Sequence, residues 1–353
     1  MINEKDNSYL ELLTTEDYLD VYFTHLHSQF DDISDNVLWL VNNLLTDRAK
    51  CRDQIMNSKI YDYVQDILTK EDINIFLLRS GIWFMSCLMK NKQTIPDDAK
   101  IMKSLYYCVK YLYIMDPELN CQCVWGIYYI SEFESSNLQI FSQILSTGAI
   151  EKIIKINFKQ QLQSLSPCLR LLGNLLSGEY NVVDQLISMR VVNFYEAVLA
   201  NVSKSESKRE VLWGLSNLSA GSIQHVHAII DSPIFDKIVL ALGDSNYSIK
   251  REAVYIIKNC LSNNCVDIST IMLNKGAMKG LVHILQNDSN QELTFYTLKS
   301  VAYFVNVDGQ SENNGNLFIS EFEALGGRPA LEKLTMNQES EISVLAKNIL
   351  EKY

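Results

Sequence analysis

The sequence predicts an all-α fold, and three observations carry that prediction. Glycine (14) and proline (5) are scarce in a chain of 353 residues. Apolar residues recur at helical spacing, and strand-like alternation is hard to find. A pair made of an aromatic residue and an Asn four positions later recurs along the chain. The first residue of each pair, degenerate copies included, stands at position 39, 83, 125, 170, 213 or 255. Steps of 42 to 45 residues are typical of helical solenoids of the armadillo or HEAT type.

Each repeat is expected to contain a short helix, a second helix and a longer third helix that carries the aromatic residue. Glycine just past a helix end favours a left-handed stop, which we expect at Gly178 and Gly221. The segments Ser146–Ile150 and Asn274–Met278 have the composition of turns that open a second helix. The third helices are predicted at Asn36–Leu45, Phe76–Met89, Cys121–Phe133, Ser166–Ser177, Lys208–Ala220 and Ile249–Ser262.

The repeat spans nearly the whole chain, which favours one continuous solenoid over two globular domains. Residues 1–15 are polar and acidic and are expected to form an arm or cap. Residues 16–316 are expected to hold about seven armadillo repeats, the last third helix lying near Tyr296–Asn306. Residues 317–353 are expected to form a capping helical pair, because the end of a solenoid must cover an apolar face.

Composition excludes several classes of function. The net charge of −11 argues against a nucleic-acid partner, which needs a basic face, and favours a basic partner. The eight cysteines lie mostly in apolar runs, which indicates reduced structural thiols in a cytosolic or nuclear protein. No signal peptide and no membrane-spanning run is visible. No motif for catalysis, a cofactor or a metal is present, so we expect a protein that is not an enzyme.

The repeated aromatic–Asn pair has a definite chemistry. Positions i and i+4 share one helix face, so Trp39 and Asn43 are expected to lie side by side. Stacked repeats would then form a row of rings beside a row of carboxamides. A carboxamide can bond the N–H and C=O of an extended peptide, and a Lys or Arg head near an indole gains about 0.5–2 kcal/mol. The acids expected nearby are Asp47, Glu132, Glu210 and Glu252. The alternative is structural: ladder asparagines can cap the neighbouring repeat, and a lone Trp on a helix is usually core.

Four segments carry a family resemblance: Val124–Ser131, Leu169–Gly178, Lys208–Gly221 and Arg251–Asn259. Lys208–Gly221 reads KREVLWGLSNLSAG, and Leu169–Gly178 reads LRLLGNLLSG, with Arg in the Trp place. Over roughly residues 16–353 the chain resembles importin-α, the karyopherin adaptor that recognises nuclear localisation signals. The resemblance implies a right-handed superhelical armadillo-repeat solenoid with two peptide sites. The implied major-like site holds Trp39, Asn43, Asp47 and Trp83. The implied minor-like site holds Trp125, Tyr129, Arg170, Asn174, Glu210, Trp213, Ser216, Asn217, Glu252, Tyr255 and Asn259.

The chain also departs from that family pattern. Cys87 stands in the place of a ladder Asn, and Gln122 in the place of an acid. The family's second-repeat Trp–Asn pair has no match upstream of residue 16. Lys5 is the only base among the first thirty residues apart from histidines, so the basic importin-β-binding segment is not found there. We therefore expect either a shortened, divergent adaptor or a fragment.

The partners that the resemblance implies are basic nuclear-localisation-signal peptides, an importin-β-type receptor and an export receptor that would bind the last repeat. It implies residence in the cytoplasm and the nucleus, without nucleic acid or membrane as a partner. The alternative function is an armadillo scaffold, or a divergent karyopherin, that binds other partners without import activity.

Overall fold

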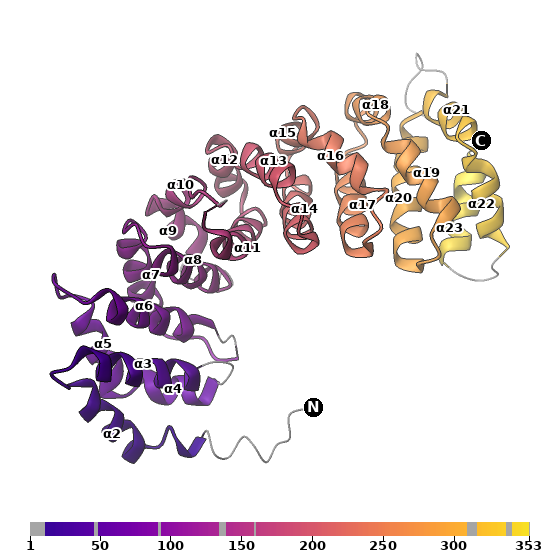
Figure 1. Ribbon diagram of the computed structural model, residues 1–353. Coiled ribbons are helices and arrows are strands. Elements are labelled where there is room, and N and C mark those ends of the chain that lie inside the picture. The colour runs from indigo at the N-terminus through magenta and orange to yellow at the C-terminus, as the bar shows by residue number, and fades with distance from the viewer. Residues whose placement is uncertain are drawn as a thin grey trace. The chain divides into compact units, whose positions relative to one another are not determined.

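The computed structural model describes residues 11–45, 49–90, 93–133, 139–158, 160–308, 316–336 and 341–352. Over these residues the chain is helical and contains no strand. By their contacts the helices fall into two compact units, Met1–Asn174 and Leu175–Tyr353, and Figure 1 labels the helices in chain order. The all-α armadillo prediction is confirmed.

The first unit contains helices in sequential groups. The order is α2 (Glu16–Leu26), α3 (Asp31–Leu45); α4 (Ala49–Met56), α5 (Lys59–Ile67), α6 (Ile75–Lys90); α7 (Asp98–Tyr111), α8 (Pro117–Ser131); and α9 (Ile140–Ser146), α10 (Ala149–Ile153), a 3₁₀ turn at Leu162–Ser164 and α11 (Leu165–Leu175). The third helices α3, α6 and α8 pack on one another in succession. The group that ends in α8 has two described helices rather than the expected three.

The second unit repeats a three-helix group four times. The order is α12 (Tyr180–Ser188), α13 (Val191–Asn201), α14 (Ser205–Ser219); α15 (Ile223–Ile230), α16 (Ile234–Ala241), α17 (Tyr247–Leu261); α18 (Val266–Asn274), α19 (Ala277–Asn287), α20 (Gln291–Asp308); and α21 (Leu317–Ala324), α22 (Gly327–Thr335), α23 (Glu341–Leu350). The third helices α14, α17, α20 and α23 pack in succession, and so do the second helices α13, α16, α19 and α22. The carboxyl end is therefore a full three-helix repeat rather than the predicted helical pair.

The core explains why the third helices are apolar almost all round. In α6, for example, Ile82, Phe84 and Met85 are 0% exposed. A third helix lies between two neighbouring third helices and the other helices of its own repeat, so more than one face is buried. Each such side chain contributes about 1.5–3 kcal/mol through burial. The face that remains open is the one that carries the aromatic–Asn pairs.

The turns follow the predicted chemistry in part. Gly148 (φ +72°) and Gly276 (φ +86°) have the left-handed backbone that opens α10 and α19, as the two predicted turns require. The prediction of left-handed stops at Gly178 and Gly221 is wrong, because neither has a positive φ. Gly221 is needed for another reason: a Cβ there would lie 2.2 Å from Nδ1 of His225.

Candidate functional site

In the first unit the aromatic–Asn pair of α3 is open. Trp39 is 59% exposed, whereas Leu38 beside it is fully buried. Asn43 is also exposed, and its Nδ2 donates to the main-chain O of Trp39 at 2.7 Å. Asn42 points the other way: it is 0% exposed, and its Nδ2 donates to the main-chain O of Ser80 on α6 at 3.0 Å. Adjacent asparagines thus divide two roles, one linking repeats and one facing solvent.

The next positions of the first-unit ladder are more closed. Trp83 on α6 is half-buried, and Cys87 is 4% exposed. Cys87 therefore lies in the packed interior and offers no open polar group in the place of the ladder Asn. Asp47, the acid expected beside this section, lies outside the described residues.

Trp125 on α8 is the centre of an aromatic group. Tyr129 stacks on it with ring centroids 5.4 Å apart and an angle of 26° between the planes. The guanidinium of Arg170 on α11 lies 5.8 Å from the Trp125 ring centroid. The Nδ2 of Asn174 donates to Oγ of Ser131 at 2.9 Å, which links α11 to α8. The structure therefore brings together the site residues that the sequence predicted on α8 and α11.

Arg79 is a component of the first unit that sequence reasoning missed. Its Nη1 lies 2.6 Å from Glu118, its Nη2 lies 2.5 Å from Asp116, and its guanidinium lies 5.6 Å from the Phe76 ring centroid. The hydrogen bond and charge of Arg79 hold the pKa of Asp116 below its ordinary value. Asp116 also caps α8 by accepting from the N–H of Leu119 at 2.8 Å. The Asp-Pro-Glu sequence at 116–118 signals this helix start, but it gives no sign of the arginine 37 residues earlier.

In the second unit, the acids predicted from sequence are not open to a ligand. Glu210 is 2% exposed and lies 3.8 Å from Arg209. Glu252 is 3% exposed and lies 2.8 Å from Arg251. The i−3 position relative to the ladder aromatic therefore turns toward the interior. A buried carboxylate that is already paired with an arginine is a poor partner for a second cation.

The ladder itself is present in the second unit. Trp213 and Asn217 on α14, and Tyr255 and Asn259 on α17, are all half-buried. Asn259 has a linking role, because its Nδ2 donates to the main-chain O of Ser216 at 3.0 Å and to Oγ of Ser219 at 3.2 Å. Ser216 is buried, and its Oγ donates to the main-chain O of Trp213. Part of the amide row thus joins one third helix to the next.

The exposed acid in this section is Glu292 on α20, which the sequence analysis missed. It accepts hydrogen bonds from the hydroxyls of Tyr247 at 2.6 Å and Tyr255 at 2.8 Å. Those bonds lower the pKa of Glu292. The pKa of Tyr255 is raised, mainly by burial and next by its hydrogen bond to Glu292. Tyr296, one turn later on α20, packs edge-on against Tyr255 with ring centroids 4.8 Å apart. Tyr296 lies one repeat beyond Tyr255, so the repeat spacing in the sequence could have identified it as a ladder aromatic.

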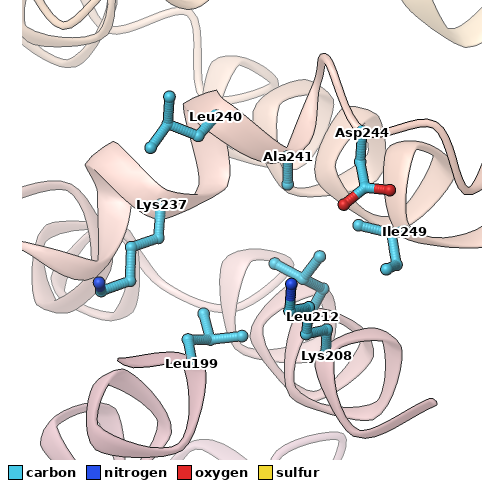
Figure 2. Close-up of a pocket in the computed structure, with 8 residues that line it drawn as sticks. All are labelled: Leu199, Lys208, Leu212, Lys237, Leu240, Ala241, Asp244 and Ile249. Carbon is cyan, nitrogen blue, oxygen red and sulfur yellow. The ribbon is translucent and has the colours of Figure 1, made fainter. Parts of the chain in front are cut away.

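The second unit also contains a cavity of about 250 Å³, and Figure 2 shows the side chains that line it. Leucines of α13, α14 and α16 line it together with two lysines and one aspartate: Leu199, Lys208, Leu212, Lys237, Leu240, Ala241, Asp244 and Ile249. No predicted site residue belongs to this set.

The part of the chain that the structure describes contains no cluster of His, Cys, Asp and Glu able to hold a metal ion. Within the same residues, no helix is long and apolar enough to span a bilayer. The eight cysteines are free thiols, seven of them buried. Burial raises the pKa of Cys108 and of Cys260 to about 12, which fits the structural role predicted for the thiols.

Comparison with known proteins gives relatives of one kind at low identity, while no protein-family model matches. Importin subunit alpha-1a of Oryza sativa subsp. japonica is 23% identical over 220 residues, which cover 62% of this chain and 41% of the relative. Importin subunit alpha-3 of Arabidopsis thaliana is 23% identical over 341 residues, which cover 94% of this chain and 62% of the relative. The matches therefore span between two fifths and two thirds of those relatives' length.

Solved structures agree on the fold. An engineered protein superposes with a TM-score of 0.75 at 16% identity, covering 98% of this chain and 90% of its own. A designed armadillo repeat protein in complex with the peptide (KR)4 superposes with a TM-score of 0.61 at 21% identity, covering 70% of this chain and 98% of its own. At these identities the superpositions establish the armadillo fold.

Proposed function

We propose that this chain, a divergent importin-α-like armadillo protein, binds extended Lys/Arg-rich peptides of the nuclear-localisation-signal type along its third helices. The observation that carries the proposal is the openness of Trp39, the one exposed ring among the ladder aromatics, the others being half-buried. Trp39 is 59% exposed on a helix whose Leu38 and Val41 are 0% exposed. Leaving a large ring in water forgoes about 1.5–3 kcal/mol of burial. A ligand that covers the ring would recover that free energy.

The chain's own cations support the choice of ligand. Arg170 lies 5.8 Å from the Trp125 ring centroid, and Arg251 lies 5.9 Å from that of Tyr255. Both distances are within the range of cation–π attraction, which contributes about 0.5–2 kcal/mol. The ladder rings thus already accept guanidinium groups from their own chain. The same chemistry at an open ring such as Trp39 would accept the side chain of an incoming Lys or Arg.

The open amide of Asn43 supports an extended backbone. Its Nδ2 makes an intrahelical bond to Trp39, and among the described residues no hydrogen bond reaches its Oδ1. A carboxamide oxygen can accept a peptide N–H, while the second amide hydrogen can be donated to a peptide C=O. Trp39 and Asn43 would therefore bind a side chain of the peptide and the adjacent peptide backbone at the same time.

The direct test is titration of a fluorescent Lys/Arg-rich peptide into the protein at low and high salt. Part of the attraction is between exposed charges and a chain of net charge −11, so affinity should fall as salt rises. A peptide of the same length with neutral or acidic residues should bind far more weakly. Equal affinity for the basic and the acidic peptide would overturn the proposal.

A second test asks which section of the ladder dominates. We expect Trp213→Ala with Asn217→Ala to weaken binding more than Trp39→Ala with Asn43→Ala, because the following ladder Asn is retained after α14 and replaced by Cys87 after α3. Truncation of a ring and its amide at a binding hot spot costs about 2–4 kcal/mol. Each double variant must keep the circular dichroism of the parent. A larger loss from the Trp39 pair would reverse the order of the two sections.

A nuclear import adaptor must also engage transport receptors and move between cytoplasm and nucleus. An importin-β-type receptor and an export receptor are the proposed partners, and a pull-down of each by the whole chain tests them. For the export receptor the proposed surface includes Glu321 and Glu323, both exposed on α21. Reversal of both charges should leave peptide binding intact and abolish receptor capture. Unchanged capture would leave the last repeat as a cap alone.

One observation favours the alternative of an armadillo scaffold for other extended partners. Glu210 and Glu252 are buried beside Arg209 and Arg251, so the second-unit ladder has fewer open acids than its sequence indicates. A scaffold of this kind would bind a basic peptide weakly and would capture no import receptor. The peptide titration and the receptor pull-down therefore separate the alternatives.

A further inference from the structure

The third helices α17 and α20 are neighbours in the second unit (Figure 1). Beyond Tyr255, lysines in place of acids occupy their open face. Two lysines there share one tyrosine ring: the Nζ of Lys258 lies 5.6 Å from the Tyr296 ring centroid, and that of Lys299 lies 5.7 Å from it. Lys258 also lies 5.9 Å from the Tyr255 ring, and Lys299 lies 4.4 Å from the Phe295 ring. Two cations therefore converge on one aromatic group.

Neither lysine is neutralised. Among the described residues, no carboxylate lies within ion-pair distance of Lys258 or Lys299, while the nearby Arg251 and Lys250 have partners in Glu252 and Asp288. Burial and then the charge of Lys299 lower the pKa of Lys258. The two positive charges repel each other, and an anion supplied by a ligand would relieve that repulsion.

The acids of the same two helices lie elsewhere. Glu252 and Glu292 are six and seven residues before the two lysines, and they are occupied by Arg251 and by the hydroxyls of Tyr247 and Tyr255. The Tyr296 hydroxyl, in contrast, makes no hydrogen bond to any described residue. Two ammonium groups and a hydroxyl that can all donate form a set suited to an oxyanion with several acceptor oxygens.

We infer that Lys258, Lys299 and Tyr296 bind an anionic side chain of the peptide that occupies the ladder, a phosphorylated serine or threonine being the best fit. The inference rests on the proposed function, and it deepens that function by assigning the peptide a charge pattern. A Lys or Arg side chain would be repelled at this section. The basic cluster of the peptide therefore ends near Tyr255, and a phosphate beside it is attracted rather than repelled.

The spacing of that pattern follows from the fold. Neighbouring packed helices lie about 8–10 Å apart, and an extended chain advances about 3.3 Å per residue. One repeat thus corresponds to about three peptide residues. The phosphorylated residue is expected about three positions from the one that contacts Tyr255, on the side of the basic cluster that points toward α20.

The experiment uses fluorescein-labelled peptides that carry one basic cluster and a single variable residue three positions before or after it. The variable residue is Ser, phosphoserine or Glu, and binding to the full chain is measured by fluorescence anisotropy. On one side of the cluster the phosphoserine peptide should bind about tenfold more tightly than the Ser peptide, with the Glu peptide between them. On the other side, phosphorylation should weaken binding.

Lys258→Gln with Lys299→Gln should abolish the phosphoserine preference, while affinity for the Ser peptide stays equal or rises because repulsion is removed. The matched control is Lys279→Gln with Lys333→Gln, which removes the same charge from exposed positions on the second helices α19 and α22; it should keep the preference. All variants are compared by circular dichroism with the parent chain.

Equal binding of the Ser and phosphoserine peptides at both positions would overturn the inference and leave basic-peptide binding in place. A preference that survives in the Lys258/Lys299 variant would also overturn it. If no basic peptide binds in any form, the proposed function fails. If the phosphoserine peptide binds and the Ser and Glu peptides do not, binding depends on the phosphate and not on the basic cluster, so the anion site is real and the basic-peptide proposal is wrong. Competition by inorganic phosphate separates recognition of phosphate alone from recognition of the phosphorylated peptide.

Discussion

Two adjacent asparagines offer a sharp test of how the ladder works. Asn42 is 0% exposed and donates from Nδ2 to the main-chain O of Ser80 at 3.0 Å, which joins α3 to α6. Asn43 is exposed, and its one side-chain hydrogen bond among the described residues is to the main-chain O of Trp39 in its own helix. If linking and ligand binding are separate tasks, Asn42→Ala must affect stability and Asn43→Ala must affect binding.

The magnitudes follow from those contacts. Asn42→Ala removes one buried hydrogen bond and leaves the Ser80 carbonyl without that donor, at a cost of about 1–3 kcal/mol. For a unit of this size, each kcal/mol lowers the melting temperature by about 2–4 °C, so a decrease of about 2–12 °C is expected. Asn43→Ala removes an exposed amide and should change stability by less than about 0.5 kcal/mol. Loss of its amide contact to a peptide should weaken binding by about 0.5–1.5 kcal/mol.

The assays are thermal and urea unfolding followed by circular dichroism, together with anisotropy titration of a basic peptide at a temperature where both variants are folded. Asn42→Ala should unfold earlier and bind the peptide normally. Asn43→Ala should unfold with the parent and bind more weakly. An Asn43 variant that melts as early as the Asn42 variant, or that binds with parental affinity, would refute the division of roles.

Two further predictions concern stability. Gly214→Ala would place a Cβ 2.4 Å from the hydroxyl of Tyr195, whose ring is 0% exposed, and should cost about 1–3 kcal/mol in urea unfolding. The matched Gly243→Ala, whose nearest atom is 3.6 Å away, should be nearly neutral. The second prediction concerns pH. Arg79 lowers the pKa of Asp116, so the pair stabilises the protein above the ordinary pKa of an aspartate and loses that contribution as pH falls through the lower folded value. Asp116→Asn should therefore flatten the decline of stability below about pH 4, and an unchanged acid unfolding curve would contradict this.

Much of the fold could be predicted because the buried face of each third helix repeats the same apolar pattern. Every third helix must present apolar residues to its neighbours, so the pattern returns at each repeat and marks the open aromatic beside it. The predicted positions of Trp39, Trp125, Trp213 and Tyr255 on third helices are confirmed for this reason. The carboxyl end was harder to predict, because α20 and α23 lack the aromatic–Asn pair and only packing reveals a complete last repeat.

The chemistry of the ladder depended on tertiary contacts that the sequence does not encode locally. Glu210 and Glu252 have the right spacing from the ladder rings, yet each is buried and lies beside the arginine that adjoins it in sequence. The pairing of Arg79 with Asp116, and the convergence of Lys258 and Lys299 on Tyr296, each join residues of neighbouring repeats. The sequence determined which residues lie on third helices, because helical periodicity is local. The tertiary structure decided which of their charges remain open, because that depends on side chains about forty residues away.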